Sequence, residues 1–183
     1  MARLPYVDPE TASEPVREVL ARLPVRLHIF QLMAHAETCF RPLLALGTAI
    51  LARQQLSAKL RELAILRVAR LSGAEYEWVQ HVPIAKAAGA SEAQVAALER
   101  GAAEATCFDA AERAVLAFTS ELVERARPSD GAFEGLLPHL SAREIVELVV
   151  AIGYYMMIAR LMETAQIDLD PPAGTAVVDA ARG

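Results

Sequence analysis

The pattern of apolar and polar positions along the chain is helical almost throughout. In "SAKLRELAILRVARLS", which begins at Ser57, apolar residues recur at the spacing that places them on one broad helix face. The same spacing runs through "CFRPLLALGTAILARQ", residues 39–54. No segment alternates apolar and polar residues in the manner of a strand. The pattern therefore predicts an all-α fold, a helical bundle of seven or eight helices.

Start and stop signals place the boundaries of these helices. We expect helices at residues 13–23, 25–35, 39–54, 57–72, 74–88, 91–99, 109–126 and 141–165. Three of the starts have the pattern of a capping box: Ser91 with Gln94, Asp109 with Glu112, and Ser141 with Glu144. Gly73 and Gly89 are expected to end helices, and Pro83 to kink the helix that contains it. The tail, residues 167–183, is rich in Pro, Gly and Ala and is expected to be a loose arm or an arm that docks on a neighbour.

Composition and charge narrow the class of protein. The 183 residues fit one domain, and 54% hydrophobic but only 5% aromatic residues indicate close-packed helices built on Ala, Leu, Val and Ile. The net charge of −5 is interspersed along the chain, without the basic footprint of a nucleic-acid-binding protein. The first residues lack the apolar core of a secretory signal, and the uncharged stretch 148–159 is far short of the roughly 20 residues that span a bilayer. We therefore expect a soluble cytoplasmic protein with no membrane or nucleic-acid partner.

Candidate chemistry is concentrated in "GAEYEWVQH", residues 73–81. Glu77 and His81 are four apart, so on a helix their side chains share one face, where a carboxylate orients an imidazole and favours its protonated form. Glu62 could reach the same point if its helix packs antiparallel to this one, which would give a group able to transfer protons. The alternative is a Glu–His pair on a solvated helix face, and the spacing alone favours this alternative.

Other kinds of site find little support in the sequence. His81 has no second histidine at helical spacing, and two glutamates with one histidine would be an unusual metal set, so no metal site is expected. Cys39 and Cys107 are distant in the sequence and form neither a disulfide framework nor a metal motif. Tyr76 and Trp78 are by residue type more often packing residues than ligand contacts.

The stretch "RELAILRVARLSGAEYEWVQHVPIAKAAGASEAQVAAL" resembles the carboxymuconolactone decarboxylase and alkylhydroperoxidase D superfamily. The resemblance rests on the Arg-Glu-Leu step at residues 61–63, the apolar helix after it, the break at Gly73, and His81 followed by the Ala-Gly ending at Gly89. Its core covers residues 56–98. The flanking segments "FRPLLALGTAILA" and "ELVVAIGYYMMIARLM" extend the resemblance over most of the chain.

This resemblance implies a domain organisation and an assembly. It implies a single all-helical domain over residues 1–183, with a core at about 56–125, an N-terminal helical extension at 1–55 and the tail at 167–183. Members of the superfamily assemble into homo-oligomers, so a dimer, trimer or hexamer is expected. The other expected partner is a small-molecule substrate.

The resemblance also divides the possible activities. The hydroperoxidase branch uses a Cys-x-x-Cys-x-x-x-His motif with a glutamate twelve residues before the first cysteine. Counted back from His81, the two cysteine positions are Ala74 and Glu77, and the glutamate is Glu62. Without the two cysteines there is no thiolate to attack a peroxide. The decarboxylase branch instead has a Glu-x-x-x-His step, which Glu77 and His81 match.

The resemblance thus favours a cofactor-independent, lyase-like enzyme that decarboxylates, or transfers a proton on, a small carboxylated or lactone-type substrate. No cofactor is required if the lactone carbonyl accepts the electrons. His81 would donate the proton, Glu77 would orient the ring and Glu62 would complete the relay.

Substrate contacts are expected from Tyr76, from Trp78 and from an arginine that binds the carboxylate. Arg67, Arg70 and Arg160 are all possible, and we take Arg67 as the candidate.

Two rival functions remain open. The first is an alkylhydroperoxidase-like antioxidant protein with peroxiredoxin activity, for which Cys39, beside Arg41, is the better thiol. The second is a non-catalytic oligomeric binding protein of the same fold.

Overall fold

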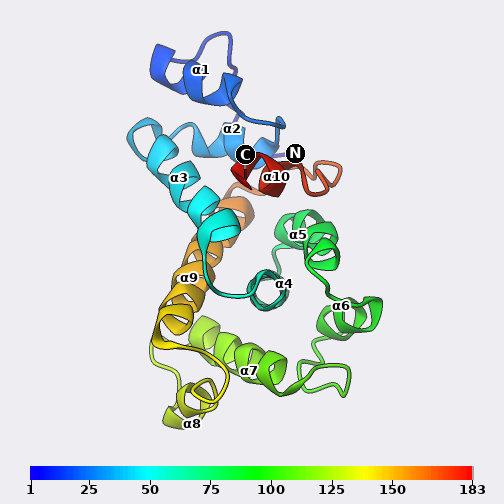
Figure 1. Cartoon of the computed structure of the whole chain (residues 1–183). Coiled ribbons are helices and arrows are strands. Elements are labelled where there is room, and N and C mark those ends of the chain that lie inside the picture. Colours follow the sequence, from blue (N-terminus) through cyan, green and yellow to red (C-terminus); the bar gives the residue numbers. More distant parts are fainter. Residues whose placement is uncertain (183) are drawn as a thin grey trace.

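The computed structural model describes residues 1–182, and within them the chain is all-helical (Figure 1). The helices are α1 (Glu14–Ala21), α2 (His28–Met33), α3 (Glu37–Arg53), α4 (Ala58–Ser72), α5 (Glu75–Ala87), α6 (Glu92–Glu99), α7 (Ala110–Glu124), α8 (Asp130–Glu134), α9 (Ala142–Ala165) and α10 (Ala176–Arg182). These residues contain no strand, and the predicted all-α fold is confirmed.

Helices α1 to α7 and α9 match the eight predicted segments. The short helices α8 and α10, of five and seven residues, are additional, because segments of this length show too little apolar periodicity to be recognised. All three predicted capping boxes are formed, at the starts of α6, α7 and α9. Helix α5 continues past Pro83 and ends at Ala87.

Gly73 connects the two helices that carry the candidate chemistry. Its φ of 66° lies in the left-handed region that favours glycine, and it ends α4 so sharply that α5 begins at Glu75. The two helices therefore pack against each other. This turn brings Glu62 in α4 to His81 in α5.

Helix α4 lies at the centre of the molecule and packs against α5, α7 and α9 (Figure 1). Leu63, Leu66 and Val68 are completely buried there, and each such side chain stabilises the fold by about 1.5–3 kcal/mol. The same helix also buries Arg61 and Glu62. Burying charged groups is costly unless they are paired, so these two need partners in the interior.

Helix α9 supplies the opposite side of this core. Leu148, Ile152 and Tyr155 are buried in the cluster that contains the apolar face of α4. By length and composition α9 is the one helix within residues 1–182 that could cross a membrane, and 44% of its most apolar window is buried inside the protein. The cytoplasmic location stays a prediction.

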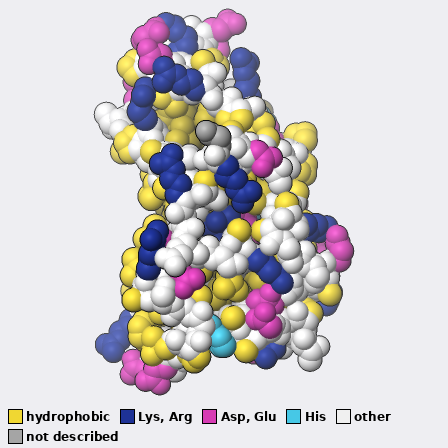
Figure 2. Space-filling model, in the orientation of Figure 1, with side chains coloured by type: hydrophobic (Ala, Val, Ile, Leu, Met, Phe, Trp, Pro, Cys, Tyr) yellow, Lys and Arg dark blue, Asp and Glu magenta, His cyan; other side chains and the backbone are white. Residues whose placement is uncertain are grey.

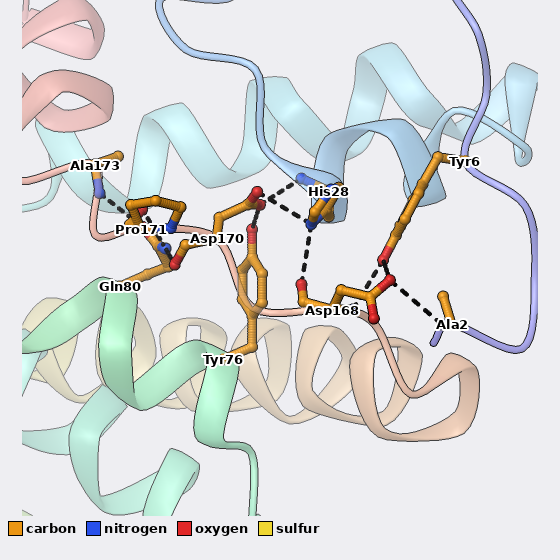
Figure 3. A network of polar contacts seen from close by, with 9 residues as sticks. All are labelled: Ala2, Tyr6, His28, Tyr76, Gln80, Asp168, Asp170, Pro171 and Ala173. Carbon is orange, nitrogen blue, oxygen red and sulfur yellow. Dashed lines mark hydrogen bonds and ion pairs between the residues drawn. The ribbon is translucent and has the colours of Figure 1, made fainter.

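The C-terminal tail packs on its own chain, so the expectation of a loose arm is wrong for residues 167–182; residue 183 lies outside the described part. Helix α10 lies against α3 (Figure 1). Asp170 accepts hydrogen bonds from the backbone N–H of His28 at 2.6 Å and from the hydroxyl of Tyr76 (Figure 3). Its second carboxylate oxygen lies 3.0 Å from Nδ1 of His28.

The surface is mixed in character. In the view of Figure 2, Lys and Arg side chains and Asp and Glu side chains both occur from one end of the molecule to the other. Apolar side chains are also exposed along α9, namely Val146, Val149, Val150 and Leu161.

Candidate active site

A cavity of about 280 Å³ lies where α2, α3, α5, α9 and α10 meet. Most of its wall is apolar. The apolar part includes Leu27, Ile29, Phe30, Leu44, Leu51, Ile158, Met162 and Val177. Ala173 and Gly174 line it too, so the tail is a structural part of the wall. A small, mostly apolar cavity with a few polar groups is the usual form of a ligand site.

The polar part of the wall comes from one face of α5. Tyr76, Glu77, Gln80 and His81 all line the cavity, and all four are buried. Their spacing of one, four and five residues places them together on a helix. The predicted cluster in "GAEYEWVQH" is therefore on a buried face, and the alternative of a solvated Glu–His pair is wrong.

Glu62 holds the ring of His81. Nδ1 of His81 lies 2.9 Å from Oε2 of Glu62, whose side chain is completely buried. The other oxygen of Glu62 accepts a hydrogen bond from Nε of Arg61 at 3.1 Å. Since the carboxylate can only accept, Nδ1 carries the hydrogen, and Nε2 is the ring nitrogen left for a molecule in the cavity. The Tyr155 ring packs edge-on against the imidazole, at 4.7 Å between centroids.

Glu77 has a different environment from Glu62. Both of its carboxyl oxygens are buried without a hydrogen-bond partner among the described residues. Burial, and then repulsion from Glu62, raise the pKa of Glu77 well above its ordinary value. The neutral, protonated form of Glu77 is therefore favoured. The prediction that Glu77 orients His81 is wrong, because Glu62 makes that contact.

Two tyrosines of α9 and a glutamine of α5 line the cavity without having been singled out by sequence. Burial raises the pKa of Tyr155 well above its ordinary value and that of Tyr154 to about 12, so both are neutral hydroxyls. The hydroxyl of Tyr154 donates to the carbonyl of Leu43 at 3.1 Å. The paired aromatics in "GYYMM" were the available signal, but helical spacing does not reveal which neighbour they face.

The tail is attached directly to this polar face. The side chain of Gln80 accepts a hydrogen bond from the backbone N–H of Ala173 at 3.0 Å and donates to the carbonyl of Pro171 at 3.1 Å (Figure 3). Tyr76 donates its hydroxyl to Asp170. Displacing the tail would therefore open the wall beside Glu77 and His81.

The three predicted substrate contacts are separated in the structure. Tyr76 lines the cavity, whereas Trp78 packs against the apolar cluster around α6. Arg67 points toward α7, where its Nε donates to the hydroxyl of Ser120 at 2.9 Å. Among the described residues, Arg22 is the one arginine or lysine in the lining, and its side chain is exposed.

Neither thiol belongs to the cavity. Cys39 is exposed near the start of α3, and Cys107 lies 3.7 Å from the carbonyl of Ala93 in the region of α6. Within residues 1–182 no three His, Cys, Asp or Glu side chains are grouped so that they could hold a metal ion.

The model of the carboxymuconolactone decarboxylase family matches residues 38–121, which include Glu62, Glu77 and His81. The comparison with curated proteins found no match.

Solved structures share the fold. A protein of unknown function from Agrobacterium tumefaciens, proposed to be the antioxidant defence protein AhpD, is 26% identical with a TM-score of 0.67, over 75% of this chain and 94% of that one. A peroxidase-related protein from Ralstonia eutropha with an alkylhydroperoxidase AhpD core has a TM-score of 0.79 at 17% identity, over 100% and 97% of the two chains. The debrominase Bmp8 has a TM-score of 0.71 at 19% identity, and the match covers 92% of this chain and 90% of that one.

Proposed function

Because the chain belongs, through residues 38–121, to the carboxymuconolactone decarboxylase and AhpD-like superfamily, we propose that it is a cofactor-independent enzyme that transfers a proton on a small substrate in this cavity. The observation that carries the proposal is the buried hydrogen bond between Glu62 and Nδ1 of His81 in the wall of an apolar cavity. A histidine whose ring is fixed by a carboxylate is a common general acid and base.

In this proposal Nε2 of His81 exchanges a proton with the substrate. Glu62 fixes the ring and stabilises its positive charge when it is protonated, and Arg61 balances the charge of Glu62 while the ring is neutral. The surrounding apolar wall strengthens these interactions because it excludes water.

The substrate is a small lactone-type or carboxylated molecule. For a carboxylated lactone, the bond to the carboxylate breaks, carbon dioxide leaves, the electron pair is delocalised onto the lactone carbonyl, and His81 returns a proton to carbon. The size of the cavity supports a small ring, and a debrominase of the same fold has been crystallised with 2,3,4-tribromopyrrole.

The test compares His81→Ala with His139→Ala, a change to an exposed histidine. Lactones and muconate-type acids are screened for carbon dioxide release, and for exchange of carbon-bound hydrogen with deuterium from solvent, followed by NMR. We expect a loss of about 10²–10⁴-fold for His81→Ala and none for the control. Turnover that survives His81→Ala unchanged would refute the proposal.

A thiol peroxidase is the second candidate, favoured by the relative proposed to be AhpD. Peroxide consumption that disappears in a Cys39→Ala, Cys107→Ala double variant would support it. The position of both thiols away from the cavity argues against it.

Self-association into a dimer, trimer or hexamer is part of the proposal. The exposed apolar side chains of α9 give it a physical basis, because surface of this kind is stabilised by contact with another copy. Light scattering after size-exclusion chromatography measures the assembly, and a change in mass on Val149→Glu would locate it on α9.

A further inference from the structure

Glu77 is a buried acid that lacks a partner. Its residue is 1% exposed, it lines the cavity, and neither carboxyl oxygen makes a hydrogen bond within residues 1–182. Nearly all buried polar groups in proteins are hydrogen-bonded, so an exception requires an explanation. A molecule bound in the cavity can supply the missing bond.

In the cavity wall, the carboxyl of Glu77 can act as a hydrogen-bond donor. Desolvation and the neighbouring Glu62 raise the pKa of Glu77, and its burial without a partner among the described residues favours the protonated carboxyl. Glu62 cannot serve in this way, since its two oxygens already face Arg61 and His81. A protonated carboxyl has one O–H to donate, and its best partner is an acceptor such as a carbonyl oxygen.

The same surroundings disfavour an anionic ligand. Arg61 and the ring of His81 are both paired with Glu62, and Arg22, the one arginine or lysine of the described lining, has an exposed side chain. A carboxylate that enters would lose its water and approach Glu62, with no unpaired buried cation in return. The cavity therefore favours neutral molecules.

We propose that the cavity binds neutral carbonyl compounds of the lactone or enone type, with the carbonyl oxygen on the O–H of Glu77 and the adjacent carbon at Nε2 of His81. Side chains four apart on a helix have Cβ atoms about 5–6 Å apart, which allows one small molecule to contact both. The inference rests on the proposed function and decides between its two substrate types in favour of the neutral one.

The corresponding reaction is a proton shift. Nε2 of His81 takes a proton from the carbon next to the carbonyl, the C–H electron pair forms the carbon–carbon double bond of an enolate, and the carbonyl π pair moves to oxygen. The O–H of Glu77 stabilises that oxygen, and His81 returns the proton to the same carbon or to a conjugated one. Nothing is oxidised or reduced, and no co-reactant is consumed. A positioned donor of this kind contributes about 10²–10³-fold in rate.

Several ionisable groups lie near Glu77, line the same cavity or pair with Glu62, and the test has to separate them. They are Glu62 and Arg61 from α4, Tyr76 and His81 from α5, Tyr154 and Tyr155 from α9, and Arg22 after α1. The variant Glu77→Gln keeps all of them and a hydrogen-bond donor, but it cannot ionise. Glu77→Leu removes the donor at similar size.

The experiment measures binding by titration calorimetry in a His81→Gln background, where the ligand is not consumed. The probes are unsaturated five-membered lactones, the same lactones bearing a carboxylate, and the methyl esters of those carboxylates. We expect lactones and esters to bind at least about tenfold more tightly than the carboxylates. Glu77→Leu weakens lactone binding about tenfold, whereas Glu77→Gln changes it less than about threefold.

The pH dependence gives a second measurement. Lactone affinity falls as the pH rises through the raised pKa of Glu77, and Glu77→Gln removes this fall. Thermal unfolding checks that each variant is folded. Carboxylates that bind as tightly as their esters, or lactone binding unchanged in Glu77→Leu, would overturn the inference. Lactones that bind through Glu77 but exchange no hydrogen in the wild-type protein would support this ligand class and refute the proposed function alone.

Discussion

Glu62 and His81 form a buried hydrogen bond of 2.9 Å between two consecutive helices, and it fixes which nitrogen of the ring faces the cavity. Glu77, on the other hand, has no hydrogen bond among the described residues, although it is one turn from His81 in α5. Two carboxyl groups near one imidazole thus differ in their surroundings, one with two partners and one with none. A site in which one acid is bonded to a guanidinium and an imidazole, while burial raises the pKa of the other, can assign them different roles.

Glu62→Ala is expected to destabilise the protein by about 3–5 kcal/mol, because it leaves the guanidinium of Arg61 buried without a counter-charge. Urea unfolding measures the change. Glu92→Ala, which removes the exposed partner of Lys86, is the control and should stay within about 0.5 kcal/mol. Equal effects of the two changes would mean that the buried group is not an ion pair.

Glu77→Gln is expected to become increasingly stabilising, relative to wild type, as the pH rises above about 4.5. In the unfolded chain Glu77 loses its proton near that pH, whereas in the folded protein its raised pKa keeps the proton on. The wild type therefore loses up to about 1.4 kcal/mol of stability per pH unit until the folded pKa is reached. Chemical denaturation from pH 4 to 9 measures the difference, and a pH-independent difference would contradict a raised pKa.

Local patterns were sufficient to predict most of the fold. The capping boxes and the apolar periodicity are set by residues within one or two turns of each other, and all of them were recovered. The tail shows the limit of such reasoning. Its Pro- and Gly-rich composition predicted a loose arm, but Asp170 contacts Tyr76, 94 positions away in the sequence. No local pattern carries that information.

The site was predicted only as far as helical geometry allows. Spacing placed Glu77 and His81 on one face, and the turn at Gly73 made the approach of Glu62 reasonable. Trp78 follows Glu77 by one residue, a rotation of about 100° around α5, and so it packs toward a different neighbour. Arg67 is likewise on another side of α4 from Glu62 and faces α7. Which face turns toward a cavity depends on tertiary packing that the sequence does not state.

Asp170→Ala is expected to release the tail from the body of the protein. It leaves the hydroxyl of Tyr76 and the backbone N–H of His28 without their acceptor, at a cost of about 1–3 kcal/mol. Hydrogen exchange followed by mass spectrometry should show faster exchange in residues 168–182. Asp130→Ala, at an exposed site in α8, is the control. Unchanged tail exchange in Asp170→Ala would show that other contacts hold the tail.

Two helical glycines should respond to alanine in opposite ways. A Cβ on Gly153 in α9 meets no atom within 4 Å, so Gly153→Ala should stabilise the protein by about 0.5–1 kcal/mol through helix propensity. A Cβ on Gly47 in α3 would lie 2.7 Å from the hydroxyl oxygen of Tyr154, and it must displace that ring within the cavity wall. We expect Gly47→Ala to be about 1–3 kcal/mol less stable than Gly153→Ala in urea unfolding. Equal stabilisation by both would show that Tyr154 has free room to move, and that this side of the cavity is not fixed by packing.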